Sequence, residues 1–138
     1  MTGEFEFVEI GPGTTGLGPF TVTAARVNHP VEAYGFRLTA DGATVAYSGD
    51  TASCDSLVDL ARDADLALIE ASFVGDAPVP DVHLTAREAG EIATRAGVRH
   101  LVPTHLVPWN DRRVTDTQVR ETFAGEVTLA ESGLVIDL

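Results

Sequence analysis

The sequence predicts an α/β domain in which a mixed β-sheet is covered by helices. Up to about residue 48, apolar and polar residues alternate with the period of β-strands, and after about residue 53 apolar residues recur with the period of helices. Two short, almost continuously apolar runs interrupt the helical part, as buried strands do. A chain that begins with strands and continues with alternating strands and helices favours a layered α/β arrangement.

The first half of the chain is expected to form strands joined by turns. The strands are expected at residues 5–8, 20–27, 34–39 and 43–48. A loop is predicted over residues 11–19, where Gly and Pro are dense. Asp41-Gly42, between the last two strands, is a dipeptide typical of β-hairpin turns.

The second half is expected to alternate between helices and strands. Helices are expected at residues 53–62, 85–96 and 115–123, and strands at residues 66–71, 100–104, 127–129 and 134–138. Ser53 is the candidate N-cap of the first helix. Thr85 and Glu88 have the spacing of a capping box at the start of the second helix, and Gly97 is its expected end.

Size and composition fit a single domain with its own core, at 138 residues of which 44% are hydrophobic. No stretch approaches the roughly 18 apolar residues that a membrane span needs. Residues 1–5 have neither the basic nor the apolar region of a signal peptide, so a cytoplasmic location is expected. The single cysteine, Cys54, excludes an internal disulfide and any multi-cysteine zinc site, and it is expected to be a small buried thiol.

The chain is strongly acidic. Its 9 basic residues are all arginine and stand against 21 acidic residues, which gives a net charge of −12. Such a surface repels polyanions, so we do not expect it to bind long nucleic acids, which require a basic footprint. A small anionic substrate stays compatible with this charge if metal ions supply local positive charge.

Polar side chains lie just beyond the ends of three predicted strands. These residues are His29, Asp50 and His105. Strand ends are where ligands and catalytic groups gather in α/β sheets. Two imidazoles and one carboxylate suit zinc, and a carboxylate can bridge two cations. Taken singly, Asp50 is more typical of a helix N-cap, and each histidine is more typical of a hydrogen-bonded core residue.

Glu70 and His83 form a second pair of candidates. Glu70 interrupts an apolar strand, where a buried carboxylate needs a partner, and His83 is the nearest candidate in sequence. A carboxylate that holds one imidazole nitrogen would raise its basicity and direct the other nitrogen at a substrate, as a general acid requires. The alternative is that Glu70 caps a neighbouring helix and His83 is a loop residue. His100 is expected at the surface.

Together these residues resemble the downstream motifs of the metallo-β-lactamase superfamily, and more closely those of its ribonuclease Z-like phosphodiesterase branch. The motifs occur in the order of that branch and cover nearly the whole chain from about Phe20 onward. They are Val27-Asn28-His29-Pro30 with Tyr34-Gly35-Phe36-Arg37, then Tyr47-Ser48-Gly49-Asp50-Thr51, Ile69-Glu70-Ala71-Ser72-Phe73, His83-Leu84-Thr85 and Pro103-Thr104-His105.

The resemblance implies half of an αββα sandwich and a site for two zinc ions. By this resemblance His29 would bind one zinc ion, His105 would bind the other, and Asp50 would bridge both. His83 would protonate the leaving oxygen or hold the phosphate, with Glu70 orienting it. The two cations would stabilise the attacking and leaving oxygens at phosphorus.

One element of the family is not found in this sequence. The run His-x-His-x-Asp-His, which supplies most of the zinc ligands, precedes these motifs in the family. Residues 1–138 therefore resemble the C-terminal part of the domain, with an incomplete ligand set. We expect an upstream half or a second protomer, as in a homodimer, to supply the rest. Alone, the chain is expected to bind zinc weakly and to be nearly inactive.

The substrate class follows partly from spacing. Ribonuclease Z carries a long insertion where only Asp41-Gly42 separates two strands here, so precursor tRNA is not expected. The short spacing, Cys54-Asp55 and Val107-Pro108-Trp109 resemble bacterial cyclic-nucleotide phosphodiesterases, which favours a small phosphodiester substrate. The alternatives are a ribonuclease Z-like nuclease or another hydrolase of the fold, and a non-catalytic half-domain that assembles through an exposed apolar face.

Overall fold

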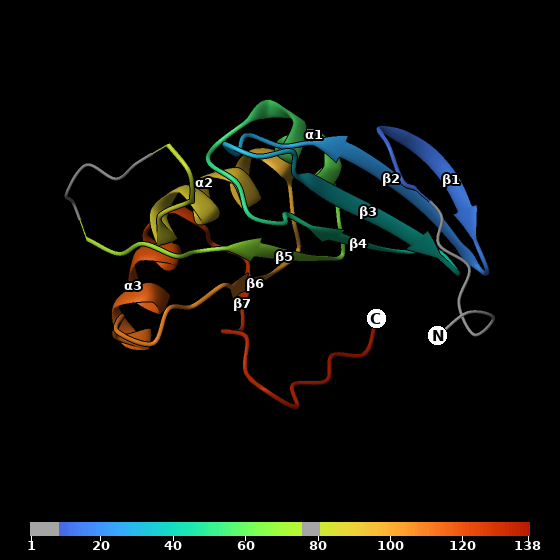
Figure 1. The fold of residues 1–138 in the computed structure, drawn as a ribbon. Helices are drawn as coiled ribbons and strands as arrows, with labels where there is room; N and C mark the ends of the chain where they lie inside the picture. The colour runs from blue at the N-terminus through green and yellow to red at the C-terminus, as the bar shows by residue number, and fades with distance from the viewer. Residues whose placement is uncertain (1–8, 76–80) are drawn as a thin grey trace.

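The computed structural model describes residues 9–75 and 81–138, which form one mixed sheet with helices packed on one face (Figure 1). The sheet has seven strands in the order of the sequence. They are β1 (Gly13–Leu17), β2 (Phe20–Arg26), β3 (Tyr34–Ala40), β4 (Ala43–Tyr47), β5 (Leu66–Glu70), β6 (His100–Thr104) and β7 (Glu126–Val127). The helices are α1 (Asp55–Ala61), α2 (Ala86–Ala96) and α3 (Arg112–Thr122). The predicted α/β class is confirmed, and the strand expected at 5–8 lies outside the described residues.

The sheet changes direction at β4. Strands β1 to β4 pair antiparallel, whereas β4 to β7 pair parallel. The parallel strands are joined by helices, as parallel connections require. The β3–β4 hairpin forms as predicted, since Asp41 and Gly42 have φ angles of 51° and 84°, the positive values that a type I′ turn requires.

The loop predicted over residues 11–19 is wrong for most of its length. Gly13–Leu17 forms the edge strand β1, which pairs with β2 from Gly13 opposite Ala24 to Leu17 opposite Phe20. Every residue of β1 is exposed, so backbone hydrogen bonds hold this strand and burial does not. An apolar pattern could not reveal it for that reason. Only Gly18-Pro19 form the turn.

Two helix starts differ from the prediction and one agrees. Helix α1 begins after Cys54, which makes no side-chain cap, so Ser53 is not the N-cap. Helix α3 begins earlier than expected, at Arg112, because the Asp111 side chain accepts a hydrogen bond from the Arg113 N–H. Its polar first turn hides that start from an apolar pattern. The capping box of Thr85 and Glu88 in α2 is confirmed, as is the end of that helix at Gly97, whose φ is 70°.

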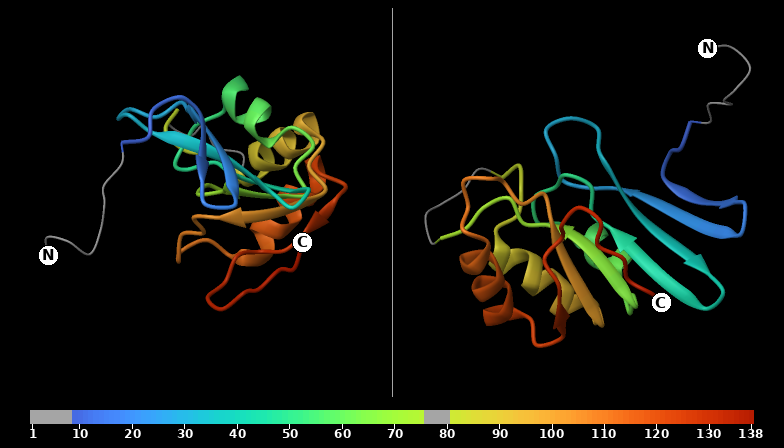
Figure 2. Two further views of the ribbon diagram at one scale, coloured as in Figure 1. Left: turned by 90° about the vertical axis from the view of Figure 1, so that its right-hand side faces the viewer. Right: turned by 90° about the horizontal axis from the view of Figure 1, so that it is seen from below.

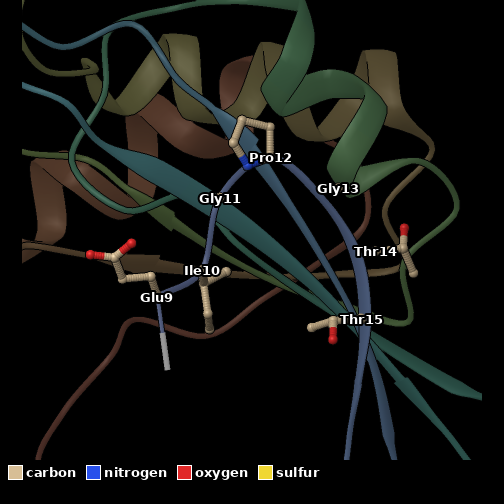
Figure 3. Close-up of a pocket in the computed structure, with 7 residues that line it drawn as sticks. All are labelled: Glu9, Ile10, Gly11, Pro12, Gly13, Thr14 and Thr15. Carbon is tan, nitrogen blue, oxygen red and sulfur yellow. The ribbon is translucent and has the colours of Figure 1, made fainter. Parts of the chain in front are cut away.

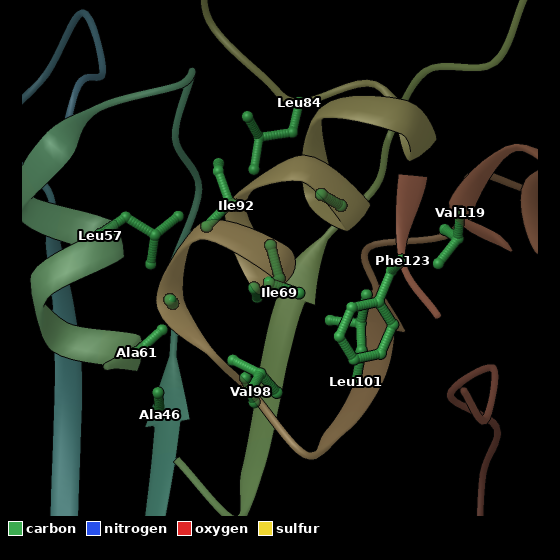
Figure 4. Packing of buried hydrophobic residues seen from close by; sticks show 14 of the residues in the cluster. Ala46, Leu57, Ala61, Ile69, Leu84, Ile92, Val98, Leu101, Val119 and Phe123 are labelled. Atoms are coloured by element: carbon green, nitrogen blue, oxygen red, sulfur yellow. The ribbon is translucent and has the colours of Figure 1, made fainter. Parts of the chain in front are cut away.

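The core lies between the sheet and the helices. Figure 4 shows Leu57 of α1, Ile92 of α2, Ile69 of β5 and Leu101 of β6 packed together there, and each is at most 1% exposed. Burying a side chain of this size contributes about 1.5 to 3 kcal/mol. This packing holds the parallel strands in place, so the side chains that follow their carboxyl ends have fixed positions.

The chain after β6 differs most from the sequence prediction. Strand β7 has only two residues, and residues 134–138 form no strand. Beyond β7 the chain passes beneath the face of the sheet opposite α1 and α2 (Figure 2), with Val135 80% exposed. His100 is not at the surface: its side chain is 12% exposed, and Nε2 lies 2.9 Å from Thr128 Oγ1. A polar partner in this C-terminal segment accounts for its burial.

The face opposite α1 and α2 is partly apolar. Ala46 and Ala67 point into the helix-covered core, so their neighbours Tyr47 and Leu68 point to the other face. Tyr47 is 42% exposed there.

None of the helices described here is long and apolar enough to cross a membrane.

Candidate functional site

Three of the predicted site residues lie at the carboxyl ends of neighbouring parallel strands. Asp50 follows β4, Glu70 ends β5, and His105 follows β6. The β5–β6 register places Glu70 opposite Thr104, the residue before His105. Because the carboxyl ends of hydrogen-bonded parallel strands meet at one edge of the sheet, these side chains converge.

Asp50, His83 and His105 form the tightest group of candidate metal ligands among the described residues. Each offers one ligand atom, and these atoms all lie within 4.8 Å of one another. His105 Nδ1 is 3.4 Å from Asp50 Oδ1, and the rings of His83 and His105 are 4.9 Å apart, centroid to centroid. The sequence assigns His29 to this group and His83 to acid chemistry, whereas in the structure His83 completes the group.

His29 lies next to His83. Their ring centroids are 5.4 Å apart, and His29 Nδ1 is 3.0 Å from the Val82 carbonyl oxygen. The neighbouring Asn28 amide donates a hydrogen bond to Asp81 Oδ1 at 3.2 Å. These two contacts hold residues 81–83 against the end of β2. All five predicted site residues therefore lie in one cluster of connected side chains, the strand-end cluster of His29, Asp50, Glu70, His83 and His105.

Glu70 is a buried hub that joins the segments of this cluster. Its side chain is 1% exposed and receives four polar contacts. Oε1 accepts from the Thr51 N–H at 2.5 Å and lies 2.8 Å from His83 Nδ1. Oε2 accepts from the Ser72 hydroxyl at 2.9 Å and from the Leu84 N–H at 3.1 Å. Glu70 therefore contacts His83, as predicted, and also the backbone of Leu84, the residue preceding the N-cap of α2.

Three residues of this network were not predicted from the sequence. The Thr51 contact uses a backbone N–H, which any residue but proline offers, so side-chain identity carries no signal for it. Ser72 donates its hydroxyl to Glu70, and its carbonyl accepts from the Asn110 side chain at 2.8 Å. Asn110 is 38 positions away from Ser72, and no local pattern indicates such a contact.

The backbone is constrained where the strands deliver their polar side chains. His105 has a φ of 53°, in the left-handed region that a residue with a Cβ adopts at some cost. Gly49, just before Asp50, has a φ of 63°, and an added Cβ would lie 2.6 Å from the Tyr34 carbonyl oxygen. Gly49 is therefore required both for its conformation and for the close approach of β3.

Substituting Gly49 by alanine is expected to lower the free energy of unfolding by about 1 to 3 kcal/mol, because strain and a backbone clash act together. The clash also displaces Asp50. Urea unfolding measures the stability change, with Gly16→Ala as the control, since a Cβ at Gly16 would meet nothing within 4 Å. Equal stability of the two variants would show that the turn tolerates a side chain.

The donor set fits zinc. Carboxylate oxygen and imidazole nitrogen are zinc ligands, and Asp50 and His105 are 52% and 39% exposed, so a cation can reach them. Metal-binding histidines commonly donate their second ring N–H to a carboxylate or a carbonyl oxygen. His83 has Nδ1 against the Glu70 carboxylate and His29 has Nδ1 against the Val82 carbonyl, which leaves Nε2 of each ring available.

Cys54 lies close to this region but outside the cluster. Burial raises the pKa of its thiol, but hydrogen bonds from Ser56, the backbone of Asn28 and Leu57, and Thr51 outweigh burial and lower that pKa below its usual value. The thiol is half-buried, so the predicted buried cysteine is only partly correct.

A shallow hollow lies beside the edge strand β1 (Figure 3). It has a volume of about 220 Å³ and is lined by residues 9–15. None of these residues belongs to the strand-end cluster. The hollow therefore does not enlarge the candidate site.

Comparison with known proteins shows the family to which this chain belongs. The model of the beta-lactamase superfamily domain matches residues 3–106. An uncharacterised protein of Mycobacterium leprae is 44% identical over 125 residues, which cover 88% of this chain and 44% of that protein. A ribonuclease Z of Myxococcus xanthus is 38% identical over 128 residues, covering 87% of this chain and 40% of that enzyme.

The probable metallo-hydrolase YhfI of Bacillus subtilis is 37% identical over 119 residues, covering 86% of this chain and 49% of that protein. Its crystal structure matches with a TM-score of 0.89 at 33% identity, over 94% of this chain and 55% of that chain. The chain belongs to the metallo-β-lactamase superfamily, and its sheet and helices have that fold. It spans about half the length of the relatives that it matches.

Proposed function

We propose that this chain is part of a zinc-dependent phosphodiester hydrolase that acts on small substrates such as cyclic nucleotides. One observation carries the proposal: Asp50, His83 and His105 converge within 4.8 Å at the strand ends. His29 and Glu70 contact the same cluster. The superfamily membership supports metal-dependent hydrolysis, and two of the relatives are named as a probable metallo-hydrolase and a ribonuclease Z.

His29, Asp50 and His105 are the residues that would hold zinc. When bound, such ions act as Lewis acids and stabilise the charge that develops on phosphate oxygens. The protein's own contribution is to fix the ligands. The Val82 carbonyl orients the His29 ring, and the backbone at His105 directs its side chain toward Asp50.

His83 is proposed as the group that protonates the leaving oxygen. Glu70 Oε1 lies 2.8 Å from its Nδ1 and orients the ring, which leaves Nε2 to donate a proton to the leaving oxygen. Three further contacts fix Glu70 itself, so the ring is held in one orientation before substrate binds. This is the arrangement that a general acid requires.

A small substrate fits the acidic chain better than RNA does. The net charge is −12, and the β3–β4 hairpin closes with Asp41-Gly42, without an inserted arm that could grip a polynucleotide. A ribonuclease Z-like nuclease is the second candidate, because a relative 38% identical to this chain bears that name.

The remaining zinc ligands are proposed to come from outside this chain. Three residues cannot fill the coordination of two zinc ions, each of which usually takes about four ligands. The sheet face that carries Tyr47 is the surface against which an upstream half or a second protomer would pack. Assembly through that face alone, without catalysis, is the non-enzymatic alternative.

The assignment of His29 and His83 predicts different effects for their alanine variants. His29→Ala is expected to weaken zinc binding, whereas His83→Ala is expected to leave zinc binding nearly unchanged and to lower kcat by about 100- to 10,000-fold, the range for a lost general acid. Zinc calorimetry and steady-state kinetics on the full-length protein measure the two effects. The assignment fails if His83→Ala loses zinc as His29→Ala does, because His83 would then be a ligand.

Parallel assays of the full-length protein on cyclic AMP, a generic phosphodiester and precursor tRNA test the function itself. We expect zinc-dependent turnover of cyclic AMP and none of precursor tRNA. The 138-residue chain alone is expected to be nearly inactive. Robust turnover by that purified chain would contradict the need for additional ligands, and cleavage of precursor tRNA alone would favour the nuclease.

A further inference from the structure

The chain has a single tryptophan, and its side chain stands in solvent. Trp109 is 81% exposed, more than any other large hydrophobic side chain in the described part of the chain. Tryptophan is the largest aromatic side chain, and leaving it in water forgoes the free energy that its burial would contribute. A single large aromatic ring held this way is suited to stack against a flat partner.

Trp109 is carried by a turn that is tied to the strand-end cluster at both ends. His105, before the turn, belongs to the cluster. Asn110, after it, donates its side-chain N–H to the Ser72 carbonyl oxygen at 2.8 Å, and the Ser72 hydroxyl donates to Glu70. The Asn110 N–H also bonds the Val107 carbonyl oxygen at 3.0 Å, which closes a turn with Pro108 and Trp109 at its tip.

The hydrogen bonds of Asn110 restrict the position of the Trp109 backbone. Consecutive Cα atoms are about 3.8 Å apart, so the Cα of Trp109 lies at that distance from the Cα of the anchored Asn110. Pro108 sits at the second position of the turn, where its fixed φ makes the turn rigid. Trp109 thus lies on a turn that follows His105 of the cluster and that the hydrogen bond from Asn110 to Ser72 ties to the Glu70 network.

We propose that Trp109 is a stacking platform for the base of a nucleotide whose phosphate binds at the strand-end cluster. This inference rests on the proposed function and adds the base to the phosphate as a part of the substrate that the protein recognises. Stacking needs no positive charge, which suits a chain of net charge −12. Every nucleobase has an aromatic face, so the platform selects nucleotides over aliphatic phosphodiesters without distinguishing strongly among bases.

A protein partner is a poorer fit for this side chain. Protein interfaces need a contiguous patch, commonly about 800 Å² on each side. The residues around Trp109 in the turn are Val107, Pro108 and Asn110, of which Val107 and Asn110 are partly buried. A single indole ring at the tip of a turn offers a contact area that matches a nucleobase and is too small for a protein interface.

Fluorescence of the 138-residue chain tests the proposal, because emission from Trp109 is the only tryptophan signal. With zinc in excess, adenosine 5′-monophosphate is expected to quench this emission in a saturable way. Ribose 5-phosphate, which has the phosphate and no base, is expected to leave the emission unchanged but to compete with the nucleotide.

Equilibrium dialysis of variants gives the second readout. Trp109→Ala is expected to bind adenosine 5′-monophosphate roughly 5- to 150-fold more weakly and ribose 5-phosphate equally well, the range that loss of one base stack produces. Trp109→Phe should retain most of the affinity. Phe20→Ala, which removes another exposed aromatic ring at the far end of β2, should behave as wild type.

The two ways of failing are distinguishable. If ribose 5-phosphate competes but Trp109→Ala binds the nucleotide as wild type does, the stacking platform is overturned while the phosphate site stands. If neither ligand binds, or ribose 5-phosphate does not compete, the strand-end cluster of this chain does not hold the phosphate, and the inference is overturned while the function proposed for the full-length protein is tested by its turnover assays.

Discussion

Replacing Glu70 by glutamine is expected to lower the free energy of unfolding by about 2 to 4 kcal/mol. The carboxylate is 1% exposed and receives four polar contacts, two on each oxygen. An amide keeps one oxygen, and its NH₂ group cannot accept hydrogen bonds. On whichever side the NH₂ group lies, it faces the backbone N–H of Thr51 or of Leu84, so at least one buried donor loses its acceptor.

The same substitution is expected to disturb the site. Residues that support a metal ligand or a catalytic histidine typically contribute 10- to 100-fold in affinity or activity. Urea unfolding and zinc calorimetry measure the two effects. Glu91→Gln is the matched control, since Glu91 is exposed on α2 and its change should stay within about 0.5 kcal/mol. A Glu70→Gln variant as stable as this control would show that the contacts of Glu70 do not stabilise the fold.

Substituting His105 by glycine is expected to remove zinc binding while leaving the fold intact. His105 has a φ of 53°, which glycine adopts without a Cβ clash, so the free energy of unfolding should stay equal or rise by up to about 1 kcal/mol. Zinc affinity should fall by more than about 10-fold, since a lost ligand costs more than a lost support for one.

Alanine at the same position is the matched comparison. His105→Ala also removes the imidazole but keeps a Cβ in the left-handed conformation, so it should lose zinc equally and be less stable than the glycine variant. Thermal unfolding in the presence of a chelator separates stability from metal binding. A glycine variant that is markedly less stable than wild type would assign His105 a structural role instead.

The parts of the fold that burial determines were predictable from the sequence. A continuous apolar run indicates strand β5, and the capping box of Thr85 and Glu88 indicates the start of helix α2. Strand β1 gives no such signal, because all its side chains are exposed and it is held by its pairing with β2 and not by burial. Residues 134–138 show the opposite error: their apolar pattern predicts a strand, but Val135 is 80% exposed and the segment forms none.

The candidate site follows the same division. Strand ends can be located from an apolar pattern, so the sequence predicts that Asp50 and His105 lie at one edge of the sheet. The contribution of Asn110 could not be found this way, because its contact with Ser72 depends on how a loop folds back across 38 positions. For the same reason, no sequence pattern indicates that His83, and not His29, groups with Asp50 and His105.

A zinc titration of the 138-residue chain by calorimetry tests the proposed metal site most directly. We expect weak binding that falls by more than about 10-fold in Asp50→Asn, which keeps the shape of the side chain and removes the charged ligand. Asp137→Asn, at an exposed position in the C-terminal segment, should bind as wild type does. Zinc uptake that is equal in wild type and Asp50→Asn, or absent from both, would contradict a metal site at the strand ends.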